Sequence, residues 1–148
     1  MAVVERHKST GRVNVSLVSG FGFTEKCGIA STFSHDSHNI IVTGTSEEDM
    51  AIAVNKLTEV GGGQVGVKDG EVIGHVEVEI AGLMSTEEAS IVSEKATSVL
   101  NGFKACGCTL NNPNMQFSLL SLVVIPELRI SDLGLVDVTK FEFVPVIE

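Results

Sequence analysis

The stretch CGIASTFSHDSHNIIVTG, residues 27–44, sets six consecutive polar residues between two apolar runs. The flanking runs, 27–33 and 40–44, have the length and residue types of buried strands. The polar segment between them, Ser34–Asn39, contains two of the four histidines of the chain. A connection that only reverses the chain needs Gly, Pro, Asn or Asp rather than paired imidazoles. The pattern therefore predicts two strands joined by a loop that binds or transforms a ligand.

Other strands are predicted on both sides of this stretch. Apolar and polar residues alternate over 13–17, which is typical of a half-buried strand. An Asp-Gly turn joins 64–68 to 71–80, and Asp-Gly between alternating segments is a strong hairpin signal. Phe141 and Phe143 alternate with charged residues and indicate a last strand.

Two main helices are predicted, each with a polar residue at its start. Ser46 is expected to cap the first helix, and the glycines at 61–63 end it. Ser85 is expected to cap the second helix, and Gly107 lies beyond its end. The predicted inner faces are Met50, Ala53, Val54 and Leu57, and then Ala89, Val92, Ala96, Val99 and Phe103. The apolar residues 115–125 fit either a buried strand or a short helix, because periodicity does not separate the two.

The chain shows no internal repeat and no linker. We therefore expect residues 1–148 to form a single α+β domain, with two main helices packed on a mixed β-sheet.

Composition narrows the class of protein. Hydrophobic residues make up 43% of the 148, which excludes a disordered chain. The net charge of −9 disfavours nucleic acid and anionic membranes as partners. The first residues lack the apolar segment of a signal peptide, and no run reaches the roughly 18 apolar residues of a membrane span. With three cysteines expected to stay reduced, the composition favours a cytoplasmic protein.

The polar loop is the strongest candidate site. His35, Asp36 and His38 are the candidate catalytic residues, and His35, His38 and Asn39 are the candidate substrate contacts, because imidazole donates, accepts and transfers protons near neutral pH. The alternative is a turn in which Asp36 and Asn39 satisfy backbone N–H groups. A metal site would need a further ligand from elsewhere, so ligand contact is the favoured interpretation and no metal site is assigned.

The other motifs are better explained by structural roles than by ligand binding or catalysis. The Gly20-Phe21-Gly22 segment lacks the following helix of a phosphate loop and is better explained as a turn. The Cys106-x-Cys108 spacing fits neither a zinc deaminase nor a redox pair, which favours packing roles. His75 alternates with acidic residues and is expected to be exposed. No self-evident catalytic machinery is present in the chain.

Several segments, taken together and in order, resemble the C-terminal domain of bacterial adenine deaminases, which are enzymes of the amidohydrolase superfamily. The matching segments are Val4–His7, Gly20–Gly22, Ile29–Thr32, His35–Gly44, Asp49–Asn55, Gly61–Gly63, Ile80–Ser85, Val124–Leu128 and Gly134–Val138. They span nearly the whole chain. Two departures are Asn114, where the family pattern has Phe, and Ser131, where it has Thr; Asn114 would weaken an apolar contact, so this loop is given no site role.

The resemblance implies an enzyme that converts adenine and water to hypoxanthine and ammonia. In that family a hydroxide activated by a metal ion attacks the purine. The metal ligands, for a divalent Mn, Fe or Zn ion, lie on a (β/α)8 barrel that precedes this domain. The present chain has no H-x-H motif and is far shorter than the roughly 250 residues of a barrel. We therefore expect no cofactor in this chain, with the barrel, as a domain or a subunit, as its partner and adenine as the substrate.

Three functions follow as hypotheses. In the first, the domain docks on the barrel, lines the purine pocket with His35, Asp36, His38 and Asn39, and contacts the barrel through Arg6 and His7; alone it is inactive. In the second, it is a non-catalytic scaffold or oligomerisation module, with a homo-oligomer as the assembly. In the third, it is a small hydrolase with a metal held by His35, Asp36 and His38. The resemblance favours the first.

Overall fold

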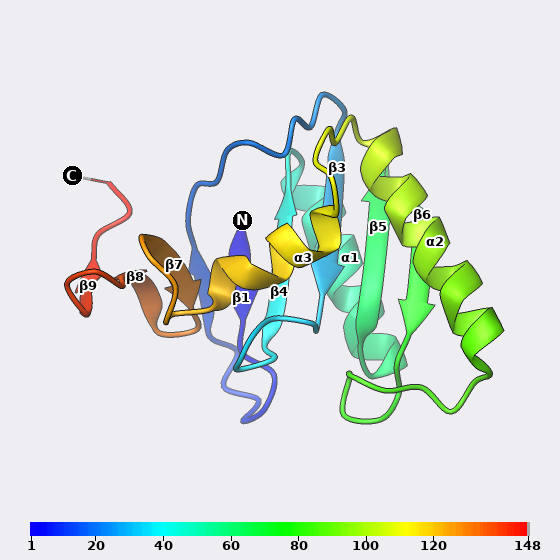
Figure 1. Ribbon diagram of the computed structural model, residues 1–148, viewed down its shortest axis with the longest axis horizontal. Helices are drawn as coiled ribbons and strands as arrows, with labels where there is room; N and C mark the ends of the chain where they lie inside the picture. Colours follow the sequence, from blue (N-terminus) through cyan, green and yellow to red (C-terminus); the bar gives the residue numbers. More distant parts are fainter. Residues whose placement is uncertain (148) are drawn as a thin grey trace.

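The computed structural model describes residues 1–147 and is built around a six-stranded sheet (Figure 1). The strands lie in the order β2-β1-β4-β3-β5-β6, and each neighbouring pair is antiparallel. Their bounds are Ala2–Val4 (β1), Val13–Val15 (β2), Cys27–Ser31 (β3), Ile40–Gly44 (β4), Gly63–Lys68 (β5) and Glu71–Glu77 (β6). The two runs that flank the polar segment are thus the two central strands, as the sequence predicts.

Helices cover both faces of this sheet. The helix α1 (Glu47–Val60) packs on the face turned away from the viewer in Figure 1, whereas α2 (Ala89–Ala105) and α3 (Pro113–Ser118) lie in front. A 3₁₀ turn, η1 (Leu119–Ser121), leads to a small antiparallel sheet of β7 (Leu128–Ser131), β8 (Gly134–Asp137) and β9 (Glu142–Val144). Among residues 1–147, no helix combines the length and the apolar character needed to cross a membrane.

Each face of the large sheet carries its own hydrophobic core. The core under α1 comprises Ala2, Ala30, Ile40, Val42, Val65 and Val67 of the sheet with Ala53 and Leu57 of the helix. The core on the opposite face comprises Val3, Ile29, Ile41 and Val76 of the sheet with Phe103 of α2, Phe117 of α3 and Ile130 of β7. The alternation of side chains along each strand separates the two sets, because consecutive residues point to opposite faces.

Most predicted elements are confirmed, together with the α+β class and the two main helices. Ser46 caps α1 by accepting a hydrogen bond from the backbone N–H of Asp49 at 3.2 Å. Gly61 ends that helix in the left-handed conformation, with φ of 87°. The Asp-Gly turn joins β5 to β6 as expected. Of the two possibilities for residues 115–125, the structure shows a short helix followed by a 3₁₀ turn.

Other details differ from the expectation. The second helix begins at Ala89 with Glu88 in the cap position, so Ser85 is not its cap. The preceding residues are held instead by Glu79, whose carboxylate accepts the Thr86 N–H at 2.9 Å. Val13 and Val15 do form a strand, but their exposed fractions are 52% and 63%, so they are not half-buried. Every pairing in the large sheet is antiparallel, which is more uniform than the mixed sheet expected.

Candidate functional site

The loop 32–39 joins β3 to β4 at one end of the sheet. The N-terminal loop, residues 5–12, follows β1 at the same end, because β1 runs antiparallel to β4 and Val4 lies opposite Ile40. The turn 80–84 also reaches this end, where Gly82 lies against Thr32 and Arg6. Two segments that are distant from the polar loop in the sequence, and from each other, therefore meet it at this end of the sheet (Figure 1).

Two buried serines fix the backbone of the loop. The Ser34 hydroxyl lies 2.7 Å from that of Ser121 in η1, and Ser121 Oγ also lies 3.1 Å from the His35 carbonyl oxygen, to which it donates. The His35 N–H donates to the carbonyl of Ser118 at 3.2 Å, and the His38 N–H donates to that of Ser34 at 2.7 Å. Hydroxyl groups buried in this way are costly unless they are paired, so their pairing defines one loop conformation.

Arg6 ties the loop to its two neighbouring segments. Its Nε donates to the His38 carbonyl at 2.6 Å, its Nη2 donates to the Ala81 carbonyl at 2.6 Å, and its backbone N–H donates to Asn39 Oδ1 at 3.3 Å. Gly82 has a φ of 73°, a left-handed conformation that favours glycine, and a Cβ atom there would lie 2.8 Å from the guanidinium. Burial lowers the pKa of Arg6 below its usual value, but the guanidinium stays protonated. Arg6 is thus a positioning residue, within the domain, for the candidate site.

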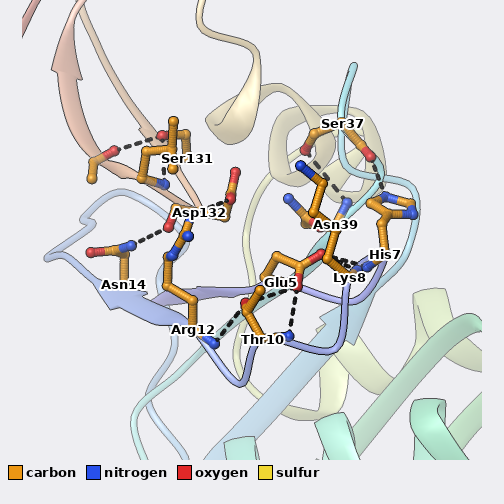
Figure 2. Close-up of polar contacts among 12 residues, drawn as sticks. Glu5, His7, Lys8, Thr10, Arg12, Asn14, Ser37, Asn39, Ser131 and Asp132 are labelled. Atoms are coloured by element: carbon orange, nitrogen blue, oxygen red, sulfur yellow. Dashed lines mark hydrogen bonds and ion pairs between the residues drawn. The ribbon is translucent and has the colours of Figure 1, made fainter.

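His7, in the same N-terminal loop as Arg6, also holds the backbone of the polar loop. Its Nε2 lies 2.6 Å from the carbonyl of Ser37, to which it donates, and its backbone N–H donates to Glu5 Oε1 at 2.6 Å. Figure 2 shows Glu5 enclosed by the backbone of its own loop, with Ser37 and Asn39 alongside. Glu5 also accepts from the Lys8 N–H at 2.7 Å and from the Thr10 N–H at 3.1 Å.

The Glu5 carboxylate is the strongest electrostatic feature of this region. Hydrogen bonds lower the pKa of Glu5 from 4.5 to about 2, although burial acts in the opposite direction. The largest contribution comes from the Thr10 N–H, followed by the Lys8 N–H, the Thr10 hydroxyl and the His7 N–H. Each of these donors stabilises the charged form. The carboxylate therefore organises the N-terminal loop that carries Arg6 and His7.

A pH dependence follows from this lowered pKa. Because the folded-state pKa is below the unfolded value of 4.5, the contribution of Glu5 to stability is complete above pH 4.5 and is lost as the pH falls toward 2. Glu5→Gln should lower the Tm at pH 7 by several degrees, and its difference from the wild type should shrink over that acid range. Thermal unfolding followed by circular dichroism measures this, with the exposed Glu94→Gln as the control. A difference that stays constant from pH 7 to pH 2 would contradict the role of the charge.

The imidazoles of His35 and His38 form a pair. Their ring centroids lie 5.5 Å apart at an interplanar angle of 69°. His38 Nδ1 lies 3.3 Å from the carbonyl oxygen of Thr32. A carbonyl can only accept, so Nδ1 carries the proton and the neutral ring keeps a lone pair on Nε2. Both rings are half-buried and Asp36 is exposed, which leaves His35, Asp36 and His38 Nε2 available to a ligand.

Asn39 is placed differently from its neighbours. It is only 3% exposed, and its side-chain oxygen is occupied by the Arg6 N–H. This geometry favours a supporting role for Asn39 beneath the loop. The sequence points to the loop but not to its supports, Glu5, Ser121 and the turn 80–84, because no local pattern shows which distant residues meet it.

The described residues do not fit a metal site. Among residues 1–147, no group of three His, Cys, Asp or Glu side chains is arranged to hold an ion. A cluster of His35, Asp36 and His38 around a metal, as required by the small-hydrolase hypothesis, is therefore not formed. Nor do the loop residues line the groove of about 850 Å³ that lies along α1.

The other residues considered as candidates, two cysteines and His75, lie in packed parts of the domain. Cys27 and Cys106 are fully buried and free, and Cys106 Sγ is hydrogen-bonded to Cys27, which together with burial raises the pKa of the Cys106 thiol. This fits the packing role expected for Cys106. His75 is not an exposed residue: its side chain is 19% exposed, because it lies opposite Val65 on the face that α1 covers. Burial lowers its pKa, although Glu77 lies 3.6 Å from its Nδ1.

Comparison with known proteins identifies where such a domain occurs. The sequence model of the family described as "Adenine deaminase C-terminal domain" matches residues 1–142. A protein named adenine deaminase from Roseobacter denitrificans is 59% identical over all 148 residues. Adenine deaminase 3 of Rhizobium meliloti is 56% identical over 147 residues, and the adenine deaminase of Brucella melitensis is 49% identical over 145. In each case the chain spans about 25% of the length of the relative.

Proposed function

This chain belongs to the adenine deaminase C-terminal domain family, and on that premise we propose that it lines the purine pocket of an adenine deaminase with its 34–39 loop. The reaction is the hydrolysis of adenine to hypoxanthine and ammonia. The barrel that the family implies is the partner, and the cytoplasm is the expected compartment, in keeping with three free cysteines. The divalent Mn, Fe or Zn ion that the family implies would be held outside this chain, whose described residues do not fit one.

One observation carries this proposal: the backbone of the loop is held by several side chains, yet the His35 ring, the Asp36 carboxylate and His38 Nε2 are left free for a ligand. Ser34, Arg6 and His7 fix its backbone through four side-chain contacts of 2.6–3.1 Å, made directly or through Ser121. The half-buried rings of His35 and His38 nevertheless remain accessible beside the exposed Asp36. Rigid support for unsatisfied polar groups is what a binding site needs, because a pre-organised group loses little entropy on contact.

The chemistry of the loop suits a purine. Adenine presents ring nitrogens that accept hydrogen bonds and an amino group and ring N–H that donate them. His38 Nε2 and the Asp36 carboxylate accept, while His35 either donates or accepts according to its tautomer. In this proposal these side chains bind and orient the purine, and no step of water activation is assigned to them.

Photolabelling tests the placement of the loop. The protein for this test is a chimeric enzyme, in which the barrel-bearing part of the Roseobacter denitrificans relative is joined to this chain in place of its own matched region. Irradiation with 8-azidoadenine should label a peptide that contains residues 34–39, and excess adenine should suppress the label. The isolated chain should stay unlabelled at the same concentration. Labelling confined to the barrel-bearing part would refute the proposal.

A further inference from the structure

The face of the sheet that α1 covers continues beyond the helix. Val15 lies opposite Ala2, which lies opposite Val42; likewise Val13 lies opposite Val4, which lies opposite Ile40. Residues directly opposite one another in antiparallel strands share a face. Ala2, Ile40 and Val42 are buried in the core under α1, whereas Val13 and Val15 belong to the same apolar surface and are uncovered.

This uncovered surface forms one wall of a groove of about 850 Å³. Strands β1, β2 and β4, helix α1 and the segment 146–147 line it, and we name it the β2 groove. Its most exposed apolar residues are Leu17 at 83%, Ile147 at 80%, Val15 at 63% and Val13 at 52%. Among residues 1–147, Glu47 is the only charged side chain that lines the groove. Clustered apolar side chains of this kind mark an interaction surface rather than a solvated face.

The opposite face of β2 is already occupied. Asn14 donates to the backbone carbonyl of Asp132, and Arg12 forms a 3.1 Å ion pair with the Asp132 carboxylate (Figure 2). These contacts hold β2 against the turn between β7 and β8. The exposure of Val13 and Val15 is therefore a property of a strand fixed in place, and the groove keeps its shape without an occupant.

The position of the N-terminus indicates the occupant. The match to the Roseobacter denitrificans relative spans all 148 residues but only 25% of its length, and the family is described as a C-terminal domain. Most of the remaining length in such a relative therefore precedes the position that corresponds to Met1. Met1 lines the β2 groove, and its amino group donates to the carbonyl of Ser16 at 2.9 Å. In such a relative, the part that precedes this domain is therefore joined at the border of the groove, where its effective concentration is high.

We propose that the β2 groove is the surface on which the barrel-bearing part of an adenine deaminase packs. This inference rests on the proposed function and names the interface through which it operates. Its occupant is an apolar surface of that preceding part, because the groove offers mainly aliphatic side chains. Docking there also acts on the candidate site: β1, which lines the groove, leads directly into Glu5, Arg6 and His7, the residues that hold the loop.

Hydroxyl-radical footprinting tests the groove in the intact proteins. In the chimeric enzyme, labelling of Val15 and Leu17 should fall about fivefold or more relative to this chain alone at low concentration, because docking excludes water. Val72 is the matched control, since it is an exposed valine, 45% accessible, on β6, the other edge strand. Its labelling should not change. Equal labelling of Val15 and Leu17 in both proteins would overturn the proposal.

Variants complete the test. Val15→Asp and Leu17→Asp in the chimeric enzyme should each speed proteolytic separation of the two parts about tenfold, whereas Val72→Asp should not. Leu17 lies outside the strands, so its variant should leave the sheet intact.

If the isolated chain shows concentration-dependent protection of the groove together with a dimer in sedimentation, a second copy is the occupant and the proposal falls. Protection in the chimera with unchanged turnover in loop variants would instead reject the proposed function and leave the interface standing.

Discussion

Replacing His38 by Asn in the chimeric enzyme should lower kcat/KM for adenine about 100-fold while leaving the fold intact, because the purine loses a contact that orients it. The Asn side-chain amide places an N–H donor close to the position of histidine Nδ1, so the contact with the Thr32 carbonyl can persist. His38 has a φ of 52°, a left-handed conformation that Asn tolerates well. The substitution therefore removes Nε2 and its lone pair and little else. Steady-state ammonia release measures the effect, with metal content and Tm determined on the same samples.

Asp69→Asn is the matched control for this variant. Asp69 has a φ of 51° and is exposed, so the same residue type enters the same backbone conformation. It follows β5 beyond Lys68, which lies opposite Cys27, whereas the candidate loop follows Ser31 at the other end of β3. Turnover of the Asp69→Asn enzyme should match the wild type.

The scaffold hypothesis predicts the opposite pattern for His38. If the loop is only a structural element, His38→Asn retains the supporting hydrogen bond and turnover stays within about twofold of the wild type. His35→Ala gives an independent reading, because that ring contributes no side-chain hydrogen bond found in the described part of the chain. Unchanged kinetics in both variants would remove the loop from the purine site.

Gly28→Ala should destabilise the domain by about 3 kcal/mol, because the added methyl group has no room beside α1. Gly28 lies in β3 opposite Gly44, on the face where α1 begins. A Cβ atom at this position would lie 2.3 Å from the backbone nitrogen of Met50 and 2.4 Å from the carbonyl carbon of Asp49. Both are backbone atoms of α1, so the contact can be relieved only by moving the helix. Chemical denaturation of the isolated chain measures the change.

Gly66→Ala is the control for this second prediction. Gly66 is also a buried glycine in an interior strand, β5, but a Cβ atom there would lie 3.7 Å from Ile73 Cγ1, an ordinary packing distance. Stability should change by less than about 1 kcal/mol, with a gain possible because alanine restricts the unfolded chain. Equal losses at Gly28 and Gly66 would show that the close approach of α1 is not what requires glycine at position 28.

The elements predicted correctly are those specified by local signals. A serine cap followed by three acidic residues defines the start of α1, and Asp-Gly defines the hairpin turn, within a few residues each. The start of α2 differs from the expectation because a side-chain contact competes with the local cap signal: the Glu79 carboxylate accepts from Thr86 and holds the segment before Ala89 out of the helix. His75 was expected to be exposed from its alternation with acids, but α1 covers that face of β6.

The candidate site divides in the same way. The loop 34–39 could be predicted because its composition differs from that of an ordinary turn. Its supports could not, since Arg6 meets Ala81 across 75 positions and Ser34 meets Ser121 across 87. The strand containing Val13 and Val15 was predicted, but their exposure was not, because the alternating pattern does not show where the covering helix ends.

Ammonia release from adenine tests most directly whether these residues act only as part of a larger enzyme. The purified 148-residue chain, with added Mn²⁺, Fe²⁺ or Zn²⁺, should release no ammonia above the uncatalysed background, whereas the chimeric enzyme should turn over and lose most of its activity on His38→Asn. Enzymatic ammonia release by the isolated chain would contradict this account.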